Sequence, residues 1–273
     1  IFNFKMAIGG DNNRAKRRKG GKKQVDPFLR KDWYAIKAPT YFAKNVVGVM
    51  PVTKTTGQVT ARDGLMGRKI CLPVADLANK GDEFRKFTLK VDDVQGIQCL
   101  TSFAGMEFTS DKIRSLIRKR QSIVEIHHDV KTTDGYVLRV FVVGFTKRQA
   151  KQKKVTSYAQ TAHIAKLRRK TINIIQKEVS TSDVAKLVTK LASEVIGKQV
   201  EKLSQSIYPL QNVFTTKVKV VRAPKGDAGR LLELHGGQDA ILKFQQEFET
   251  NAANQASAPV ERAEEAVEEI TAQ

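Results

Sequence analysis

The residues with the clearest capacity for chemistry in this sequence are lysines and arginines, which gather in two runs. Nine of the 24 residues from Lys147 to Lys170 are Lys or Arg, and none is acidic. The segment from Arg14 to Lys31 holds nine basic residues against one carboxylate, Asp26. Runs of one charge repel themselves unless a polyanion neutralises them. Their chemistry is therefore the binding of phosphate groups, where each contact releases bound counterions.

The charge of the whole chain has the same sign. Its 273 residues carry a formal net charge of +20, and the pI is about 10.0. From Gln245 onward, seven Glu and one basic residue give −6, so residues 1–244 carry +26. We predict nucleic acid as the partner, bound along an extended surface. No apolar run approaches the ~18 residues of a membrane span, and no secretory signal is visible, so we expect a cytosolic protein without a membrane partner.

Aromatic residues follow the first basic run within a few positions. Trp33, Tyr34, Tyr41 and Phe42 could anchor the basic arm on the core or stack on bases, and the sequence leaves both interpretations open. The predicted RNA-binding residues are Arg14, Lys16, Arg17, Arg18, Lys19, Lys22, Lys23, Arg30, Lys31, Trp33, Lys147, Arg148, Lys151, Lys153, Lys154, Arg168, Arg169 and Lys170.

The other reactive side chains form no recognisable catalytic or metal site. His127, His128 and Asp129 resemble metal ligands, but consecutive side chains on a strand point to opposite faces. Cys71 and Cys99 are isolated in apolar stretches and are expected to be small core residues in a reducing compartment. No phosphate-binding glycine loop and no nucleophile-elbow motif occurs. We therefore predict no enzymatic activity, no metal and no cofactor.

Two rival interpretations remain. An RNA-processing enzyme would need a carboxylate or histidine constellation, and none is recognisable. A DNA-binding module would usually show a helix-turn-helix or zinc-ligand signal, and neither is present.

The first elements that must position the basic runs are strands. Residues 46–54, 58–61, 68–74, 84–91 and 97–103 read as short strands between Gly, Asp and Asn breaks. Ser110 or Asp111 is expected to cap a short helix with Ile113, Leu116 and Ile117 on one face. Residues 122–130 and 136–145 predict a hairpin in which Gly135 takes a positive φ.

Helical spacing follows Thr146. Apolar residues from Ile164 to Ile175 repeat at roughly the helical period, and Ser182 and Asp183 are expected to cap a second helix. We expect Gly197 to separate that helix from a third, with Val200, Leu203 and Ile207 inward. Residues 213–221 should return to the sheet, and residues 239–248 predict a last helix.

Strands first and helices later, with one late strand, predict an α+β fold. The expected core is a small curved antiparallel sheet or β-barrel with flanking helices. Residues 6–31 lack the apolar content to fold alone, so this basic N-terminal arm is expected to be disordered in the free protein. The predicted divisions are a basic RNA-binding extension at 1–25, an α+β core at 26–237, and a helix with an acidic tail at 238–273.

A series of short motifs resembles one known family. In order they are D-W-Y-A-I-K-A-P at 32–39, D-V-Q-G at 93–96, V-K-T-T-D-G-Y at 130–136, V-G-F-T-K at 143–147, T-S-Y-A-Q at 156–160, S-I-Y-P-L at 206–210 and E-L-H-G at 233–236. Together they resemble the small-subunit ribosomal protein three-A family, the S-one-e family of eukaryotes and archaea, from about Met6 to Gly237. Met6 matches the initiator position, so residues 1–5 are expected to lie upstream of the natural start.

The resemblance implies a structural, non-enzymatic role. It implies a place on the platform of the small ribosomal subunit, near the messenger exit and the 3′ end of the small-subunit ribosomal RNA. Neighbouring ribosomal proteins would be partners, and initiation factors would use part of the same surface. It also implies a barrel-like core with packed helices, an RNA-bound N-terminal extension, and a cytoplasmic ribosome reached through the nucleolus in a eukaryote.

Overall fold

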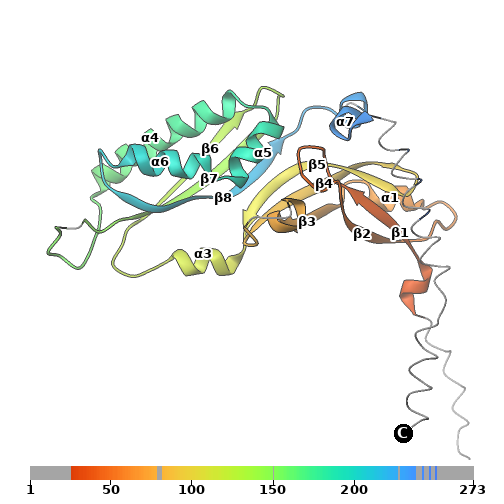
Figure 1. The fold of residues 1–273 in the computed structure, drawn as a ribbon, viewed down its shortest axis with the longest axis horizontal. Coiled ribbons are helices and arrows are strands. Elements are labelled where there is room, and N and C mark those ends of the chain that lie inside the picture. Colours follow the sequence, from red (N-terminus) through yellow and green to blue (C-terminus); the bar gives the residue numbers. More distant parts are fainter. Residues whose placement is uncertain are drawn as a thin grey trace, which may run out of the picture.

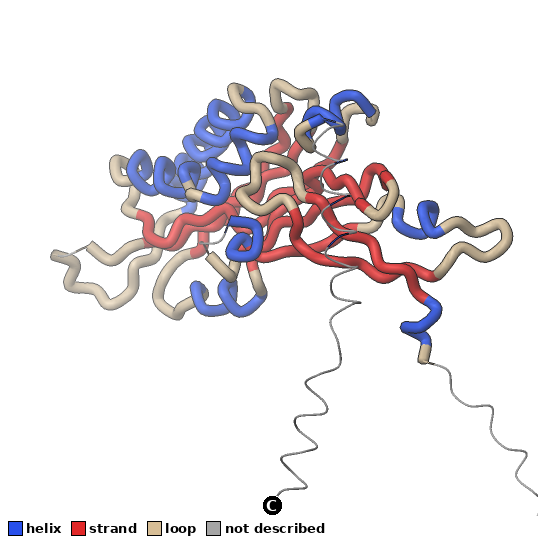
Figure 2. The backbone as a smooth tube through the Cα atoms, turned by 45° about the vertical axis from the view of Figure 1, so that its right-hand side comes forward, coloured by secondary structure: helices blue, strands red, loops and turns tan. Residues whose placement is uncertain are grey.

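The computed structural model describes residues 26–78, 82–149, 151–226 and 228–237, together with Leu242, Gln246 and Thr250. Within these residues the fold is α+β, as predicted, with an open mixed sheet of eight strands and seven α-helices. The tube in Figure 2 shows the strands as one continuous layer with most of the helices on its upper side.

Two groups of strands make up the sheet (Figure 1). The first group is β1 (Lys31–Lys37), β2 (Val46–Thr53), β3 (Lys69–Pro73), β4 (Arg85–Gln95) and β5 (Gln98–Phe108). The second group is β6 (Ile123–Lys131), β7 (Val137–Thr146) and β8 (Leu210–Arg222). The two groups join where residues 105–107 of β5 pair with residues 217–219 of β8.

One strand pair is parallel, where the sequence analysis expected an antiparallel sheet or barrel. Residues 35–37 of β1 pair with residues 98–100 of β5 in parallel, and the other strand pairs of the described sheet are antiparallel. A parallel pair needs a long crossover connection. The segment that contains β2, β3 and β4 provides that connection, and the sheet stays open.

The predicted hairpin is confirmed. β6 and β7 pair antiparallel from Ile123 with Phe145 to Lys131 with Val137, and Gly135 in their connection has φ 86°. Val140 is buried while Arg139 is exposed and forms a bidentate pair with Asp129 on the neighbouring strand. The alternation of the sequence therefore translates directly into a buried and an exposed face.

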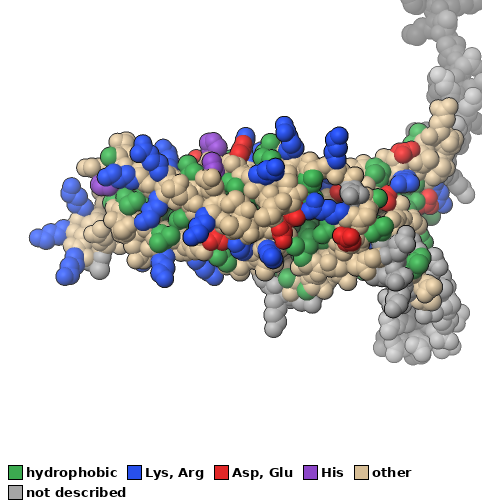
Figure 3. Space-filling model, turned by 90° about the horizontal axis from the view of Figure 1, so that it is seen from above, with side chains coloured by type: hydrophobic (Ala, Val, Ile, Leu, Met, Phe, Trp, Pro, Cys, Tyr) green, Lys and Arg blue, Asp and Glu red, His purple; other side chains and the backbone are tan. Residues whose placement is uncertain are grey.

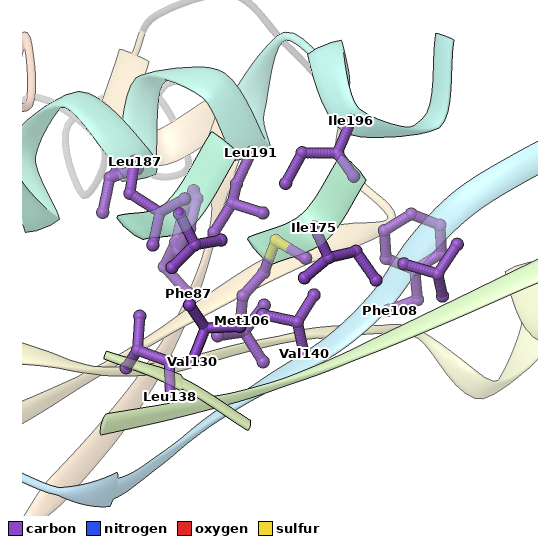
Figure 4. Packing of buried hydrophobic residues seen from close by; sticks show 14 of the residues in the cluster. Phe87, Met106, Phe108, Val130, Leu138, Val140, Ile175, Leu187, Leu191 and Ile196 are labelled. Atoms are coloured by element: carbon purple, nitrogen blue, oxygen red, sulfur yellow. The ribbon is translucent and has the colours of Figure 1, made fainter. Parts of the chain in front are cut away.

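Helices cover one face of the second strand group. They are α4 (Thr161–Ser180), α5 (Val184–Ala192) and α6 (Val195–Ser204). Figure 4 shows Ile175, Leu187, Leu191 and Ile196 of these helices pointing toward Val140 and its neighbours on the strands. The remaining helices are α1 (Ala61–Leu65), α2 (Val74–Ala78), α3 (Ser110–Leu116), α7 (Ala228–Leu234) and the 3₁₀-helix η1 (Pro27–Arg30).

The junction between α5 and α6 differs from the prediction. Gly197 lies inside α6, and the break falls at Glu194, whose φ is 55°. The Glu194 carboxylate lies 2.7 Å from the buried Arg85 guanidinium and accepts the Thr215 N–H at 2.6 Å. These buried contacts hold Glu194 in the left-handed region, so the expectation that Gly197 separates the two helices is wrong.

Several smaller predictions are also wrong. Residues 58–61 form no strand: Val59 makes one isolated bridge, and Thr60 caps α1 by accepting the Asp63 N–H at 3.2 Å. Side chains expected to be inward but found exposed are Ile113, Ile117 and Leu203, and Cys71 is also exposed. Ile117 and Leu203 lie at helix ends, where few neighbours are available to cover them, whereas Ile113 and Cys71 lie within α3 and β3 on a side that faces solvent.

The expected arm is ordered at its last residues. Asp26 accepts the Phe28 N–H and caps η1, and Lys31 begins β1, so the expectation of disorder over 6–31 fails for 26–31. Residues 1–25 lie outside the described part, and so does most of the predicted helix at 239–248. The divisions at 25 and 237 stay predictions.

Candidate nucleic-acid interface

The second basic run begins in a loop that leaves the buried end of β7. Thr146 is buried, its hydroxyl oxygen accepts the Ser122 N–H at 2.9 Å, and the Lys147 N–H donates to the Pro209 carbonyl at 2.9 Å. The exposed side chains of Lys147 and Arg148 therefore start from a backbone that is fixed on both sides.

The rest of this loop is held by one glutamine. The side-chain amide of Gln152 donates to the carbonyls of Lys154 at 2.9 Å and Thr156 at 2.6 Å. Arg148 donates to the Gln152 carbonyl at 3.3 Å. Lys151, Lys153 and Lys154 are exposed around this hydrogen-bonded turn. Because the described residues of this loop are already held by hydrogen bonds, they lose less conformational entropy when their cations bind a partner.

A second basic loop lies beside the first. It connects α3 to β6 and presents Arg118, Lys119 and Arg120 to solvent. The Ser157 N–H and hydroxyl both donate to the Arg120 carbonyl, at 2.9 and 3.2 Å, and Ser157 forms a parallel bridge with Gln121. Arg120 itself has φ 69°, an unusual conformation for a non-glycine residue, and the two bonds to its carbonyl stabilise it.

These contacts create a surface that the sequence analysis missed in part. We call it the basic end, composed of Arg118, Lys119, Arg120, Lys147, Arg148, Lys151, Lys153 and Lys154. The available signal for its first three members was a triplet of adjacent basic residues, too short to be called a run. Figure 1 shows both loops at the left end of the long axis.

The arginines of α4 continue the cationic surface, but the neighbouring lysine has another contact. Arg168 and Arg169 are exposed, while Leu167 and Thr171 form part of the buried face of α4. The Lys170 ammonium donates to the Leu203 carbonyl at 2.6 Å and the Ser206 hydroxyl at 3.0 Å. Lys170 therefore satisfies backbone at the C-terminal end of α6, where a cation is favoured.

The eight cations of the basic end have no acidic partners in the part of the chain that the structure describes. Several described carboxylates elsewhere have basic partners; Lys190, for example, hydrogen-bonds Glu178 and holds its pKa below the usual range. Figure 3 shows blue Lys and Arg side chains at the left end, with red carboxylates beginning nearer the middle. An unscreened field of one sign attracts a polyanion.

The first basic run is not brought to the same place. Arg14, Lys16, Arg17, Arg18, Lys19, Lys22 and Lys23 lie outside the described residues. Arg30 and Lys31 belong to η1 and β1, at the opposite end of the long axis from the basic end (Figure 1). Trp33 lies there too and is 49% exposed, so its side chain does not anchor the basic arm on the core. Phe42, in contrast, is buried.

The histidines, the other candidate functional residues, lie in positions that strand geometry and core packing explain. His127 is exposed and His128 half-buried on the opposite face of β6, as strand geometry requires. His235 is buried, its Nε2 lies 2.9 Å from the Thr101 carbonyl oxygen, and burial lowers its pKa to about 4. Among the described residues, no group of three His, Cys, Asp or Glu side chains is placed to hold a metal ion. No described helix combines the length and apolar character needed to cross a membrane.

An α+β scaffold that presents clustered cations without ion pairs among its described residues is typical of polyanion-binding proteins. The sequence matches the Ribosomal S3Ae family over residues 19–224, which is most of the chain. The chain belongs to this family, and the resemblance drawn from its motifs is confirmed. It is a structural constituent of the small ribosomal subunit with a role in translation, and the family is one of ribosomal proteins rather than enzymes.

Proposed function

We propose that the chain binds small-subunit ribosomal RNA through the basic end, with Arg168 and Arg169 extending the contact along α4. The observation that carries this proposal is the joining of two loops, distant in sequence, by Ser157 and Arg120. Eight cations that form no ion pair within the described part of the chain therefore share one surface. Such a surface grips the RNA backbone without reading its sequence. Its role is therefore to position the protein.

Within this surface the arginines should contribute more than the lysines. A guanidinium donates two parallel hydrogen bonds to one phosphate, whereas an ammonium acts as a point charge. Lys170 should contribute least of the predicted residues, because its ammonium already has two oxygen partners. The remaining predicted contacts, from Arg14 to Lys23 with Arg30 and Lys31, form a second RNA-binding area in this proposal.

The position of the protein on the small subunit and its protein partners are also part of the proposal. The family resemblance supports a position on the platform near the messenger exit, beside neighbouring ribosomal proteins and within reach of initiation factors. It supports a contribution to subunit assembly and initiation, with passage through the nucleolus if the source is a eukaryote. Residues 1–25 would act as an RNA-binding extension of the core at 26–237.

Co-sedimentation with small ribosomal subunits in high-magnesium sucrose gradients tests this function. The test variant replaces Lys151, Lys153 and Lys154 with Ala. The matched control replaces the exposed Lys44, Lys69 and Lys177, which removes the same charge elsewhere. We expect the control to sediment with the subunit like wild type and the test variant to be largely lost from it. Equal sedimentation of both variants would contradict the proposed contact.

Two further assays separate the rival functions. Competition between structured RNA and duplex DNA for the purified chain should favour the RNA if the ribosomal role is correct. Incubation of RNA with the chain and Mg²⁺ should leave the RNA intact, whereas cleavage that survives purification would indicate an RNA-processing enzyme.

A further inference from the structure

Two exposed aromatic rings lie at the end of the molecule opposite the basic end. Phe28 of η1 is 54% exposed and Trp33 of β1 is 49% exposed. Their ring centroids are 6.3 Å apart and the ring planes differ by 13°, so the rings are nearly parallel. The folded core leaves about half of each side chain in contact with water. Large aromatic side chains in such a position are available to a partner.

The backbone fixes both rings. Asp26 accepts the Phe28 N–H at 2.9 Å, and the Lys31 N–H donates to the Phe28 carbonyl. The Lys54 N–H donates to the Arg30 carbonyl at 3.2 Å, and Trp33 pairs with Pro51 across the β1–β2 ladder. The aromatic surface is therefore formed before any partner arrives, and binding needs little ordering of these residues.

Cations surround the rings. The Lys31 ammonium lies 5.0 Å from the centroid of the Phe28 ring, and Arg30 next to it is exposed. Arg68 donates to the Pro51 carbonyl at 3.0 Å, which places its guanidinium close to the strand position opposite Trp33. In the sequence, the densest basic segment, Arg14–Lys23, leads directly into this site.

This combination favours one kind of partner. The centre of a protein–protein interface is depleted of charged residues, Lys in particular. Surfaces that bind single-stranded nucleic acid instead combine aromatic rings, on which bases stack, with cations that follow the backbone. A paired base offers no free face in the middle of a duplex, so the chemistry fits an unpaired base.

We infer that Phe28 and Trp33 form a stacking platform for an unpaired base of RNA, whose flanking phosphates contact Arg30 and Lys31. This inference rests on the proposed function, since it assumes that RNA is the partner. It adds a second type of contact: the basic end grips backbone phosphates, and the platform holds a base at the other end of the molecule.

The chain contains its own reporter, because Trp33 is its one tryptophan. The full chain is titrated at fixed salt with a short single-stranded oligouridylate, and Trp33 fluorescence is recorded. An abasic ribose-phosphate oligomer of equal length and charge is titrated in parallel. We expect saturable quenching by the oligouridylate and little by the abasic oligomer, because stacking requires the base. Equal quenching by both would overturn the platform.

The Phe28→Ala variant keeps the reporter and removes one ring. We expect it to bind the oligouridylate about 5-fold or more weakly, since one stacked base contributes about 1–3 kcal/mol. Val59→Ala, which trims a side chain that is 65% exposed outside the platform, should bind like wild type. Wild-type affinity for Phe28→Ala would overturn the role of that ring.

Failure of this inference can be told apart from failure of the proposed function. If the oligouridylate leaves Trp33 unquenched while structured ribosomal RNA still binds through the basic end, the platform is wrong and the proposed function stands. If neither RNA binds, both are wrong. If the Lys151, Lys153 and Lys154 triple Ala variant loses structured RNA but keeps the quenching, both are supported as separate contacts.

Discussion

Replacing Gly197 with Ala tests how α6 is positioned on the sheet. Helix propensity alone predicts that Ala in the interior of a helix stabilises it by about 1 kcal/mol relative to Gly. The structure predicts the opposite. An added Cβ would lie 2.2 Å from the Val213 carbonyl oxygen and 2.8 Å from the Glu194 carboxylate.

The size of the expected destabilisation follows from how far α6 must move to make room for the added Cβ. Ordinary contacts to a Cβ begin at 3.4 Å, so α6 would have to move away from β8 by about 3.4 − 2.2 = 1.2 Å. Overpacking of this kind costs about 1–3 kcal/mol. The same movement stretches the bond of 2.6 Å between the Thr215 N–H and Glu194, and a weakened buried bond adds about 1 kcal/mol or more. After the gain of about 1 kcal/mol from helix propensity is subtracted, we expect a net loss of about 1–3 kcal/mol.

Urea unfolding followed by far-ultraviolet circular dichroism measures this loss. Gly48→Ala is the control, since a Cβ at Gly48 meets nothing within 4 Å. The control should stay within about 1 kcal/mol of wild type. A Gly197→Ala protein at least as stable as wild type would refute the close approach of α6 to β8.

The remaining predictions concern stability and its dependence on pH. Replacing Gly135, whose φ is 86°, with Val should lower the melting temperature, since β-branched residues resist positive φ; an unchanged value would count against this turn. Burial lowers the pKa of His235 to about 4, so between pH 6.5 and 4 His235 is protonated in the unfolded chain but stays neutral in the folded chain. Unfolding free energy should fall over that window by up to about 3 kcal/mol more in wild type than in His235→Gln, and parallel curves would contradict this. The hydrogen bond from Lys190 lowers the pKa of Glu178 in the folded chain. This pair therefore stabilises the fold above the ordinary pKa range of Glu, and the stabilisation is lost as the pH falls through the pKa of Glu178 in the folded chain. In urea unfolding at several pH values from 2 to 5, Glu178→Gln should lose less unfolding free energy on acidification than wild type.

The parts of the fold that could be predicted depend on local patterns. The β6–β7 hairpin follows from alternation around Gly135, and α4 follows from apolar residues at the helical period. The same local reading located the exposed cations of the loop after β7. These features are decided by neighbours in sequence, so one chain is enough to find them.

The parts that could not be predicted depend on contacts between distant residues. Glu194 separates α5 from α6 because Arg85, on β4, reaches its carboxylate. The parallel pairing of β1 with β5 depends on how the intervening strands fold back. The hydrogen bond from the Lys170 ammonium to the Leu203 carbonyl depends on the packing of α4 beside α6. Local sequence propensity does not determine contacts between residues this far apart in the sequence.

The same limit applies to the candidate site. Arg120 joins the loop after β7 through Ser157, a partner 37 positions away. The sequence analysis found the cations of the loop after β7 but not Arg118, Lys119 and Arg120, and only the folded chain shows that the two groups share a surface. The folded chain also separates Arg30 and Lys31 from the basic end, although both were predicted to bind RNA together with the cations of the loop after β7.

The salt dependence of RNA affinity tests the central claim most directly. Affinity for a structured fragment of small-subunit ribosomal RNA is measured at several salt concentrations for wild type and two triple Ala variants. One variant changes Arg118, Lys119 and Arg120, and the other changes Lys151, Lys153 and Lys154. Each phosphate contact removed should flatten the plot of log K against log salt by about 0.7–0.9, so each variant should lose about 2–3 in slope. A variant that merely unfolds would lower the active fraction and keep the slope. Wild-type slope and affinity in both variants would contradict phosphate binding by the basic end.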